Sequence, residues 1–409
     1  MLKNLEIGLY QMTEGRKLKK KYLFMTLLLT ALIFGLGAPK AMAATMDFTI
    51  NPQIPSNQAN PGEGFYDLLM PTPGSQQNLQ IVFKNVSKKT VTVETAVASA
   101  TTATSGVVQY TPNNIKDDKT LKYDLKSLVQ IPSEITLSPD QTKIVTVKVS
   151  MPSESFHGII AGGLTFKEKG NTQSTSSNKG IMITNAYQYM VSVLMRQFHD
   201  KQAPQLVLNN VVAGQENARN VISVNLENTA AYFLNNMNVN AQVVGLDNSS
   251  LKYSFKNSAM QMAPNSNFNM AIPVSLQGAL TANQYSKPLQ AGKYRMTMTA
   301  YGQEDSAGSY SAPDTTGTTQ HYDYRWTFTK DFTITQAQAA ALNKTDMSLP
   351  KTNYFWIYVM IALAVVLVAA FVTFFVVSRK RKRTHANEKD QLQAKIDAMQ
   401  KELEAKNKD

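Results

Sequence analysis

Residues 143–149 of the chain read Lys143-Ile144-Val145-Thr146-Val147-Lys148-Val149, with apolar valines at every second position. The stretches Leu79-Gln80-Ile81-Val82-Phe83 and Thr90-Val91-Thr92-Val93 repeat this alternation. A period of two, with β-branched residues, is typical of a β-strand that has one buried face. This part of the chain is therefore predicted to be built from β-sheets.

Turn sequences separate these predicted strands, as Pro73-Gly74 and Ser138-Pro139-Asp140 do. Only residues 121–129 have spacing typical of a short helix, and the Ser/Asn-rich residues 170–178 indicate a hairpin tip. After the polar segment that begins at His199, a second run of about seven strands is predicted between Leu206 and Ile334. The expected fold is all-β, with two immunoglobulin-like β-sandwich domains in tandem over residues 44–198 and 199–340.

The amino-terminal segment has the pattern of an export signal. A basic stretch at residues 16–21 precedes the apolar residues 23–36, and Ala41-Met42-Ala43 matches a small-x-small cleavage site. Ala41 and Ala43 are thus the expected recognition residues for cleavage. Residues 1–43 are predicted to be a signal peptide.

The carboxyl-terminal segment has the pattern of a membrane anchor. Residues 354–377 are apolar or aromatic except for Thr373, and they are long enough to cross a bilayer core of about 30 Å. A stop-transfer cluster follows, made of Arg379, Lys380, Arg381, Lys382 and Arg383. We therefore expect an extracellular amino-terminal region, a stalk at 341–353 and a cytoplasmic tail at 378–409.

Two features of this end leave alternatives open. In the tail, Leu392, Ile396, Met399 and Leu403 have helical spacing, which suits pairing with another tail, contact with the inner leaflet, or a solvated helix. Residues 349–353 resemble a sortase signal but have Asn353 where that signal needs Gly. A retained membrane helix is the favoured interpretation.

The formal charge of +12 is concentrated at the two ends of the chain. The leader holds seven Lys or Arg and two acids, and residues 354–409 hold ten against six. The 24 bases and 21 acids that remain leave the exported region almost neutral. This region lacks the basic field that nucleic-acid binding needs.

No signature of catalysis or of a cofactor is found. The chain has no cysteine and none of the usual motifs for hydrolases, zinc peptidases or nucleotide binding. One S-x-x-K match, Ser176 to Lys179, falls in the Ser/Asn-rich stretch and not at a helix start. His157, His199 and His321 are scattered, so neither a catalytic nor a metal site is predicted.

Several stretches, in order along the exported region, resemble the WxL-interacting protein family of Gram-positive bacteria. They are Phe48-Thr49-Ile50, Gly64-Phe65-Tyr66-Asp67-Leu68, Gly106-Val107-Val108-Gln109-Tyr110, Phe156 to Gly163, Gly292-Lys293-Tyr294 and Trp326-Thr327-Phe328. The resemblance implies that the first domain binds peptidoglycan and that the second binds host matrix proteins. It also implies WxL-type surface proteins as partners.

Two sets of residues are candidates for binding. Tyr66, Tyr110 and Tyr187 could offer aromatic faces to the sugar rings of peptidoglycan, although half-buried strand positions are the plainer interpretation. The second set is Phe156, His157, Gly158, Gly162 and Gly163, in a predicted strand. Glycines there permit close backbone approach, either by a ligand or by the protein's own sheets.

These observations predict a non-catalytic scaffold in the cell membrane that links peptidoglycan, WxL-type proteins and host matrix proteins. A surface receptor that signals through its tail and a sortase-anchored adhesin are the alternatives.

Overall fold

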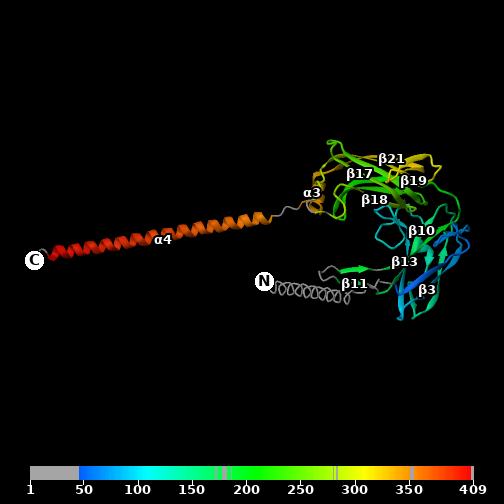
Figure 1. Cartoon of the computed structure of the whole chain (residues 1–409), viewed down its shortest axis with the longest axis horizontal. Helices are drawn as coiled ribbons and strands as arrows, with labels where there is room; N and C mark the ends of the chain where they lie inside the picture. Colours follow the sequence, from blue (N-terminus) through cyan, green and yellow to red (C-terminus); the bar gives the residue numbers. More distant parts are fainter. Residues whose placement is uncertain are drawn as a thin grey trace, which may run out of the picture.

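A computed structural model of the chain describes residues 46–170, 173–176, 182–185, 187–279, 281, 284–350 and 354–406. It contains two β-domains followed by a long helix (Figure 1). The predicted signal peptide, including Ala41 and Ala43, lies outside the described residues.

The first domain is a sandwich of two sheets. One sheet has the order β1 (Phe48–Gln53), β3 (Gln76–Asn85), β9 (Thr142–Ser150) and β7 (Val129–Gln130). The other has the order β2 (Tyr66–Leu69), β13 (Gln188–Arg196), β10 (Ile160–Glu168), β4 (Val91–Ser99) and β8 (Glu134–Leu137). Smaller elements are β5 (Thr101–Thr102), β6 (Val108–Gln109), α2 (Leu125–Leu128), β11 (Gln173–Ser176) and β12 (Met182–Asn185).

The alternation at residues 143–149 has the predicted effect in β9. Val145, Val147 and Val149 are buried between the sheets, because side chains on a strand point to opposite faces in turn. At the edge of the second sheet, β2 runs parallel to β13. There Arg196 Nη2 lies 2.7 Å from Asp67 Oδ1, in an ion pair that is itself buried.

The second domain is also a sandwich. Its smaller sheet has the order β14 (Leu206–Glu216), β15 (Arg219–Asn228) and β18 (Ser266–Pro273). Its larger sheet has the order β17 (Lys252–Met262), β16 (Leu234–Gly245), β19 (Gly292–Glu304), β21 (Thr319–Ile334) and β20 (Tyr310–Pro313). The seven predicted strands are all present, and β20 is an eighth that the sequence did not reveal.

The two cores differ in composition. Branched aliphatic and aromatic side chains dominate the first core. The second buries six methionines: Met237, Met260, Met262, Met270, Met296 and Met298. Methionine is flexible and polarisable, so it fills irregular space between sheets.

The segment after β21 folds onto the second domain. Helix α3 (Gln336–Thr345) begins with a capping box in which Thr335 and Gln338 bind each other's backbone amides. Beyond it, Asp346 and Ser348 are buried. The predicted stalk is therefore wrong as far as Ser348, because buried polar groups fix this part of the segment to the domain.

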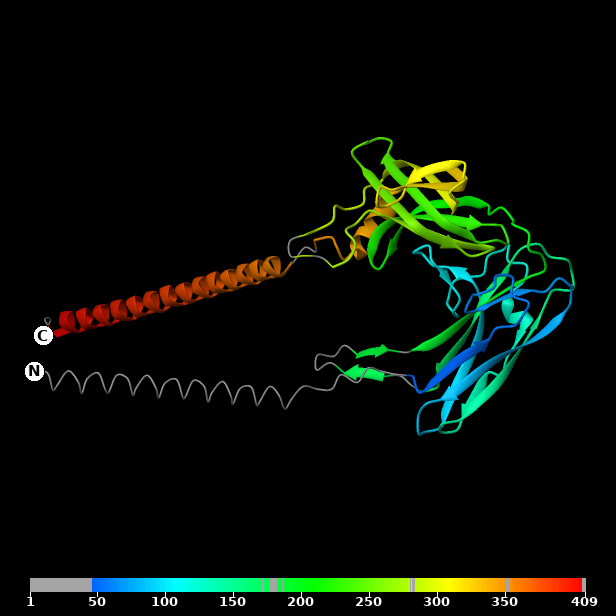
Figure 2. The ribbon, with the colours of Figure 1, turned by 45° about the vertical axis from the view of Figure 1, so that its right-hand side comes forward.

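A single helix, α4 (Phe355–Lys406), leads away from the end of the second domain where α3 lies (Figures 1 and 2). Among the described residues it is the one helix long and apolar enough to cross a membrane. The predicted amphipathic tail is part of this same helix.

Candidate binding cleft between the two domains

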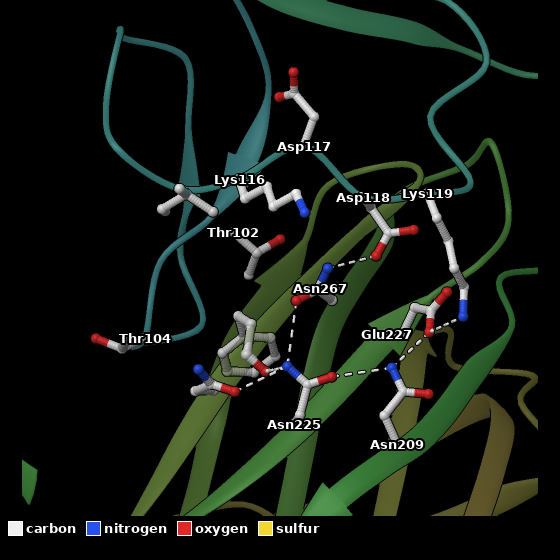
Figure 3. Close-up of a pocket in the computed structure, with 13 residues that line it drawn as sticks. Thr102, Thr104, Lys116, Asp117, Asp118, Lys119, Asn209, Asn225, Glu227 and Asn267 are labelled. Atoms are coloured by element: carbon white, nitrogen blue, oxygen red, sulfur yellow. Dashed lines mark hydrogen bonds and ion pairs between the residues drawn. The ribbon is translucent and has the colours of Figure 1, made fainter.

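A cleft of about 560 Å³ lies between the domains. Its floor is the outer face of the second domain's smaller sheet, with Asn209, Asn225, Glu227 and residues 267–269. Segments of the first domain, Thr102, Thr104 and residues 115–119, form its opposite wall (Figure 3). Residues from both domains therefore share one hollow.

Strand alternation explains why the floor is polar. Val224 and Leu226 of β15 are buried in the core, so the residues between and after them, Asn225 and Glu227, point to the outer face. Asn225 pairs with Asn269 of β18, and Glu227 pairs with Asn267. The sheet thereby brings four amide and carboxylate side chains together.

These floor side chains hydrogen-bond to one another. Asn225 Nδ2 donates to Asn269 Oδ1 at 2.8 Å and to Asn267 Oδ1 at 3.2 Å. Asn209, at a β-bulge in β14, donates its Nδ2 to Asn225 Oδ1 at 3.0 Å and to Glu227 Oε2 at 2.5 Å (Figure 3). The network holds the amides in fixed orientations.

Glu227 is the buried charge of the cleft. Its side chain is 2% exposed, and Lys119 Nζ of the first domain lies 3.5 Å from its Oε2. Its other oxygen, Oε1, is buried and has no hydrogen-bond partner among the described residues. A carboxylate oxygen without a partner is costly, so this position favours an additional donor.

Asp118 connects the wall to the floor. Asn267 Nδ2 donates to Asp118 Oδ2 at 2.5 Å, and Thr120 donates both its amide and its hydroxyl to Oδ1. Burial by itself would raise the pKa of Asp118, but the hydrogen bonds from Thr120 and Asn267 and the charge of Lys119 lower it below its usual value. Asp118 is therefore an acid-sensitive contact between the domains.

Further hydrogen bonds join the two domains beside the cleft. The hydroxyls of Thr102 and Ser266 lie 2.7 Å apart, and Thr102 Oγ1 accepts from the amide of Ala263 at 3.0 Å. The amide of Ile159 donates to the carbonyl of Ala231 at 2.7 Å. The two domains are thus joined by both side-chain and backbone hydrogen bonds.

The predicted glycine-rich strand begins later than expected. Strand β10 starts at Ile160, because Gly158 has a φ of +130° that a regular strand does not accept. A Cβ at Gly158 would lie 2.5 Å from the carbonyl oxygen of Ala231, in the second domain. Gly158 therefore serves the domain contact.

Gly162 and Gly163 lie inside β10, where the protein's own residues fill the space beside them. A Cβ at Gly162 would clash with the carbonyl oxygen of Ala98, and one at Gly163 would clash with Tyr110. Both glycines therefore permit close packing within the first domain, and the structure leaves no room for a ligand at either.

The three candidate tyrosines lie in different environments. Tyr66 is fully buried, with its hydroxyl donating to the carbonyl of Gln80 at 2.8 Å, so its proposed contact with sugar rings is wrong. Burial raises its pKa well above the usual value. Tyr110 is partly buried against Gly163, whereas Tyr187 is exposed. The structure does not bring them into one site.

Phe156 and His157 lie close to the junction of the domains. Phe156 packs edge to face on Tyr123. His157 stacks on Phe198, and its Nδ1 lies 2.8 Å from Asp200 Oδ2. The hydrogen bond from His157 lowers the pKa of Asp200. His157 thus contacts the segment that connects the two domains, through Phe198 and Asp200. The sequence did not reveal Asp200 as its partner, because the two residues are far apart in the chain.

The cleft is lined by hydrogen-bonding and charged side chains. Within the described residues, no group of three or more His, Cys, Asp or Glu side chains could hold a metal ion. The asparagines of the cleft were not among the candidate binding residues predicted from the sequence. The alternation of Asn225 and Glu227 in β15, and the sequence Asn267-Phe268-Asn269, were the available signals.

Solved structures that match the chain include PapD-like domain 7 of human CEP192, at 11% identity. The match covers 40% of this chain and 96% of that chain, with a TM-score of 0.23. The Salmonella enterica SafA pilin in complex with the SafB chaperone matches at 7% identity with a TM-score of 0.25. That match covers 70% of this chain and 97% of that chain. The E. coli chaperone DraB matches at 11% identity with a TM-score of 0.24, over 68% of this chain and 95% of that chain. Likenesses this distant carry no functional inference.

Among curated proteins, none matches the chain. Two family models do match it. The WxL Interacting Protein peptidoglycan binding domain matches residues 48–168, and the WxL Interacting Protein host binding domain matches residues 178–344. The second match begins before β13, a strand that belongs to the first sandwich. Together the matches cover most of the chain, which therefore belongs to the WxL Interacting Protein family.

Proposed function

We propose that the chain is a non-catalytic scaffold at the cell surface, in which the first domain, over residues 44–198, binds peptidoglycan. The second domain, over residues 199–340 with α3 and Ser348 packed onto it, binds protein partners. These partners are WxL-type surface proteins and host matrix proteins. Helix α4 holds the scaffold in the membrane, with the two domains outside and the basic tail inside.

The cleft is the observation that carries this proposal. Its fixed amides suit the hydroxyl and amide groups of a wall polymer. A volume of about 560 Å³ accommodates a few sugar units or a short peptide. Since both domains line the cleft, a bound polymer would contact them together.

Sedimentation with purified sacculi tests the proposal. The full-length protein in detergent should sediment with the sacculi, and Asn225→Ala should weaken binding because Asn225 is the centre of the amide network. Asn240→Ala, at an exposed position on β16, is the matched control. Equal binding by both variants would place the polymer elsewhere, and failure of the unaltered protein to sediment would refute the peptidoglycan function.

Two cell experiments separate the alternatives. Release of the protein by detergent alone, without an enzyme that degrades the wall, would rule out a sortase linkage. Deletion of residues 387–409 should leave surface binding intact in a scaffold, whereas a receptor would lose its downstream response.

A further inference from the structure

A second hollow lies at the opposite end of the second domain from the first domain. This base pocket, of about 650 Å³, is formed by the start of β17 and by the connection from β18 to β19. Its lining includes Lys252, Tyr253, Ser254, Tyr285 and Lys287. It is separate from the cleft, with which it shares no lining residue.

The base pocket has the chemistry of an anion site. Two lysines, four serines and two tyrosines line it, and no Asp or Glu is among the lining residues. Lys252 and Lys287 are exposed and form no ion pair within the described part of the chain. Free ammonium groups beside hydroxyls suit a phosphate group.

Asp346, a carboxylate that bonds to the pocket residue Ser275, already has its hydrogen bonds satisfied. Asp346 Oδ2 accepts from Ser275 Oγ at 2.5 Å and from the amide of Asn220 at 2.9 Å. Its Oδ1 accepts from the amide and the hydroxyl of Ser348. Asp346 is buried, and no ion pair joins it to either lysine within the described part of the chain.

The connection to α4 places this end of the domain near the membrane. Ser348 is buried, and the amide of Ser286, a pocket residue, donates to its carbonyl at 3.0 Å. Six residues separate Ser348 from the start of α4 at Phe355. Even fully extended, a connection of this length spans at most about 25 Å.

Exposed apolar side chains line the base pocket or lie in segments next to its lining residues. They are Leu246, Leu276, Tyr285 and Met347, which are 46%, 44%, 57% and 62% exposed. Apolar and aromatic side chains beside lysines are typical of surfaces that enter the headgroup layer of a bilayer. The position of the pocket, its lysines and these four apolar side chains, here called the apolar fringe, all suit contact with a membrane surface.

We propose that the base pocket binds the phosphate headgroup of an anionic membrane lipid, so that the second domain rests on the outer leaflet. The inference rests on the proposed anchoring by α4 but not on peptidoglycan binding. Lys252 and Lys287 contact the headgroup, and the apolar fringe enters the interface. At roughly fivefold for each lysine, the pair strengthens docking about 25-fold.

Full-length protein in lipid nanodiscs tests this inference. The chain has no cysteine, so Leu246→Cys introduces one labelling position at an exposed side chain. Its fluorophore should be quenched by nitroxide-labelled headgroups in discs that contain phosphatidylglycerol, and much less in phosphatidylcholine alone. Val212→Cys, on the exposed side of β14, is the control and should stay unquenched.

The lysines are tested in the same discs. Lys252→Gln with Lys287→Gln should abolish the phosphatidylglycerol-dependent quenching, whereas Lys84→Gln with Lys330→Gln, two exposed lysines elsewhere, should not. Quenching that ignores lipid charge or the base lysines would overturn the headgroup assignment. Absence of quenching in both discs would overturn docking itself.

Two further outcomes would distinguish lipid binding from binding of free phosphate esters and from a failure of membrane anchoring. Soluble glycerol phosphate that abolishes quenching at micromolar concentration would show a site for free phosphate esters and overturn the lipid assignment; no displacement is expected. Failure of the protein to enter nanodiscs at all would refute the anchoring by α4 and is recognised before any quenching is measured.

Discussion

The cleft and the base pocket lie at opposite ends of one β-sandwich and differ in chemistry. The cleft mixes four asparagines with three acids and two lysines, whereas the base pocket has lysines and hydroxyls without an acid. Mixed, mutually bonded groups suit an uncharged polar ligand, and unpaired cations suit an anion. The fold is the same around both, so strand-end and loop residues determine what each end binds.

The largest effect that would separate the two ends is expected from Asp346→Ala. Removing this buried acceptor leaves two amides and two hydroxyls of the base without a partner, at a cost of about 4 kcal/mol in unfolding free energy. Faster hydrogen exchange in residues 336–348 measures it, with Asp247→Ala, at an exposed position, as control. Binding to sacculi should persist; its loss would show that the ends are not independent.

Gly158→Ala should disturb only the end beside the cleft. The new Cβ meets the carbonyl of Ala231, and the φ of +130° adds strain, for a cost of about 2 kcal/mol. Faster exchange of the Ile159 amide, which donates to Ala231, reports the opening. Gly62→Ala also has a positive φ but nothing within 4 Å, so it shows the strain alone. An equal response of both variants would contradict the role of the contact.

Glu227→Gln sharpens the chemical comparison. Gln keeps one oxygen but replaces the other with an NH2 donor and removes the charge that Lys119 contacts, so the cleft should loosen and binding to sacculi should weaken about tenfold. Lipid-dependent quenching at the base should not change. Glu63→Gln removes the same charge from an exposed position of the first domain. Unchanged sacculus binding would exclude Glu227 from the site.

Acid should loosen the cleft by the smallest of these effects. Because the pKa of Asp118 in the folded chain lies below its usual 3.8, its contribution is complete above that value and is lost as pH falls through the lower, folded value. Closure of the domains should therefore weaken only below about pH 4. Small-angle scattering against pH measures it, and Asp118→Asn should remove this dependence. A transition near neutral pH would implicate another group.

Strand alternation was enough to predict both sandwiches, since Val145, Val147 and Val149 behave as their period indicates. It could not predict the cleft. Asn225 and Asn269 are 44 residues apart in sequence and meet only because β15 pairs with β18 in one register. Strand registers between distant segments are not visible in local pattern.

The errors have a similar origin. Tyr66 belongs to a strand buried on both faces, and a tyrosine in such a strand has the same local pattern as one that offers its ring to solvent. Gly158 was recognised as unusual, but Ala231, which explains it, lies in the other domain. Residues 341–348 seemed a stalk because the buried acceptor role of Asp346 depends on loops more than fifty residues away.

The methionines of the second core have a consequence for a protein exposed to oxidants. Conversion of a buried thioether to its sulfoxide places a polar oxygen where no donor waits, so each oxidation removes packing that branched residues would have kept. Six such side chains make the second domain the more vulnerable of the two. In an oxidising environment, the second domain, which forms the floor of the cleft, should lose its packing before the first domain does.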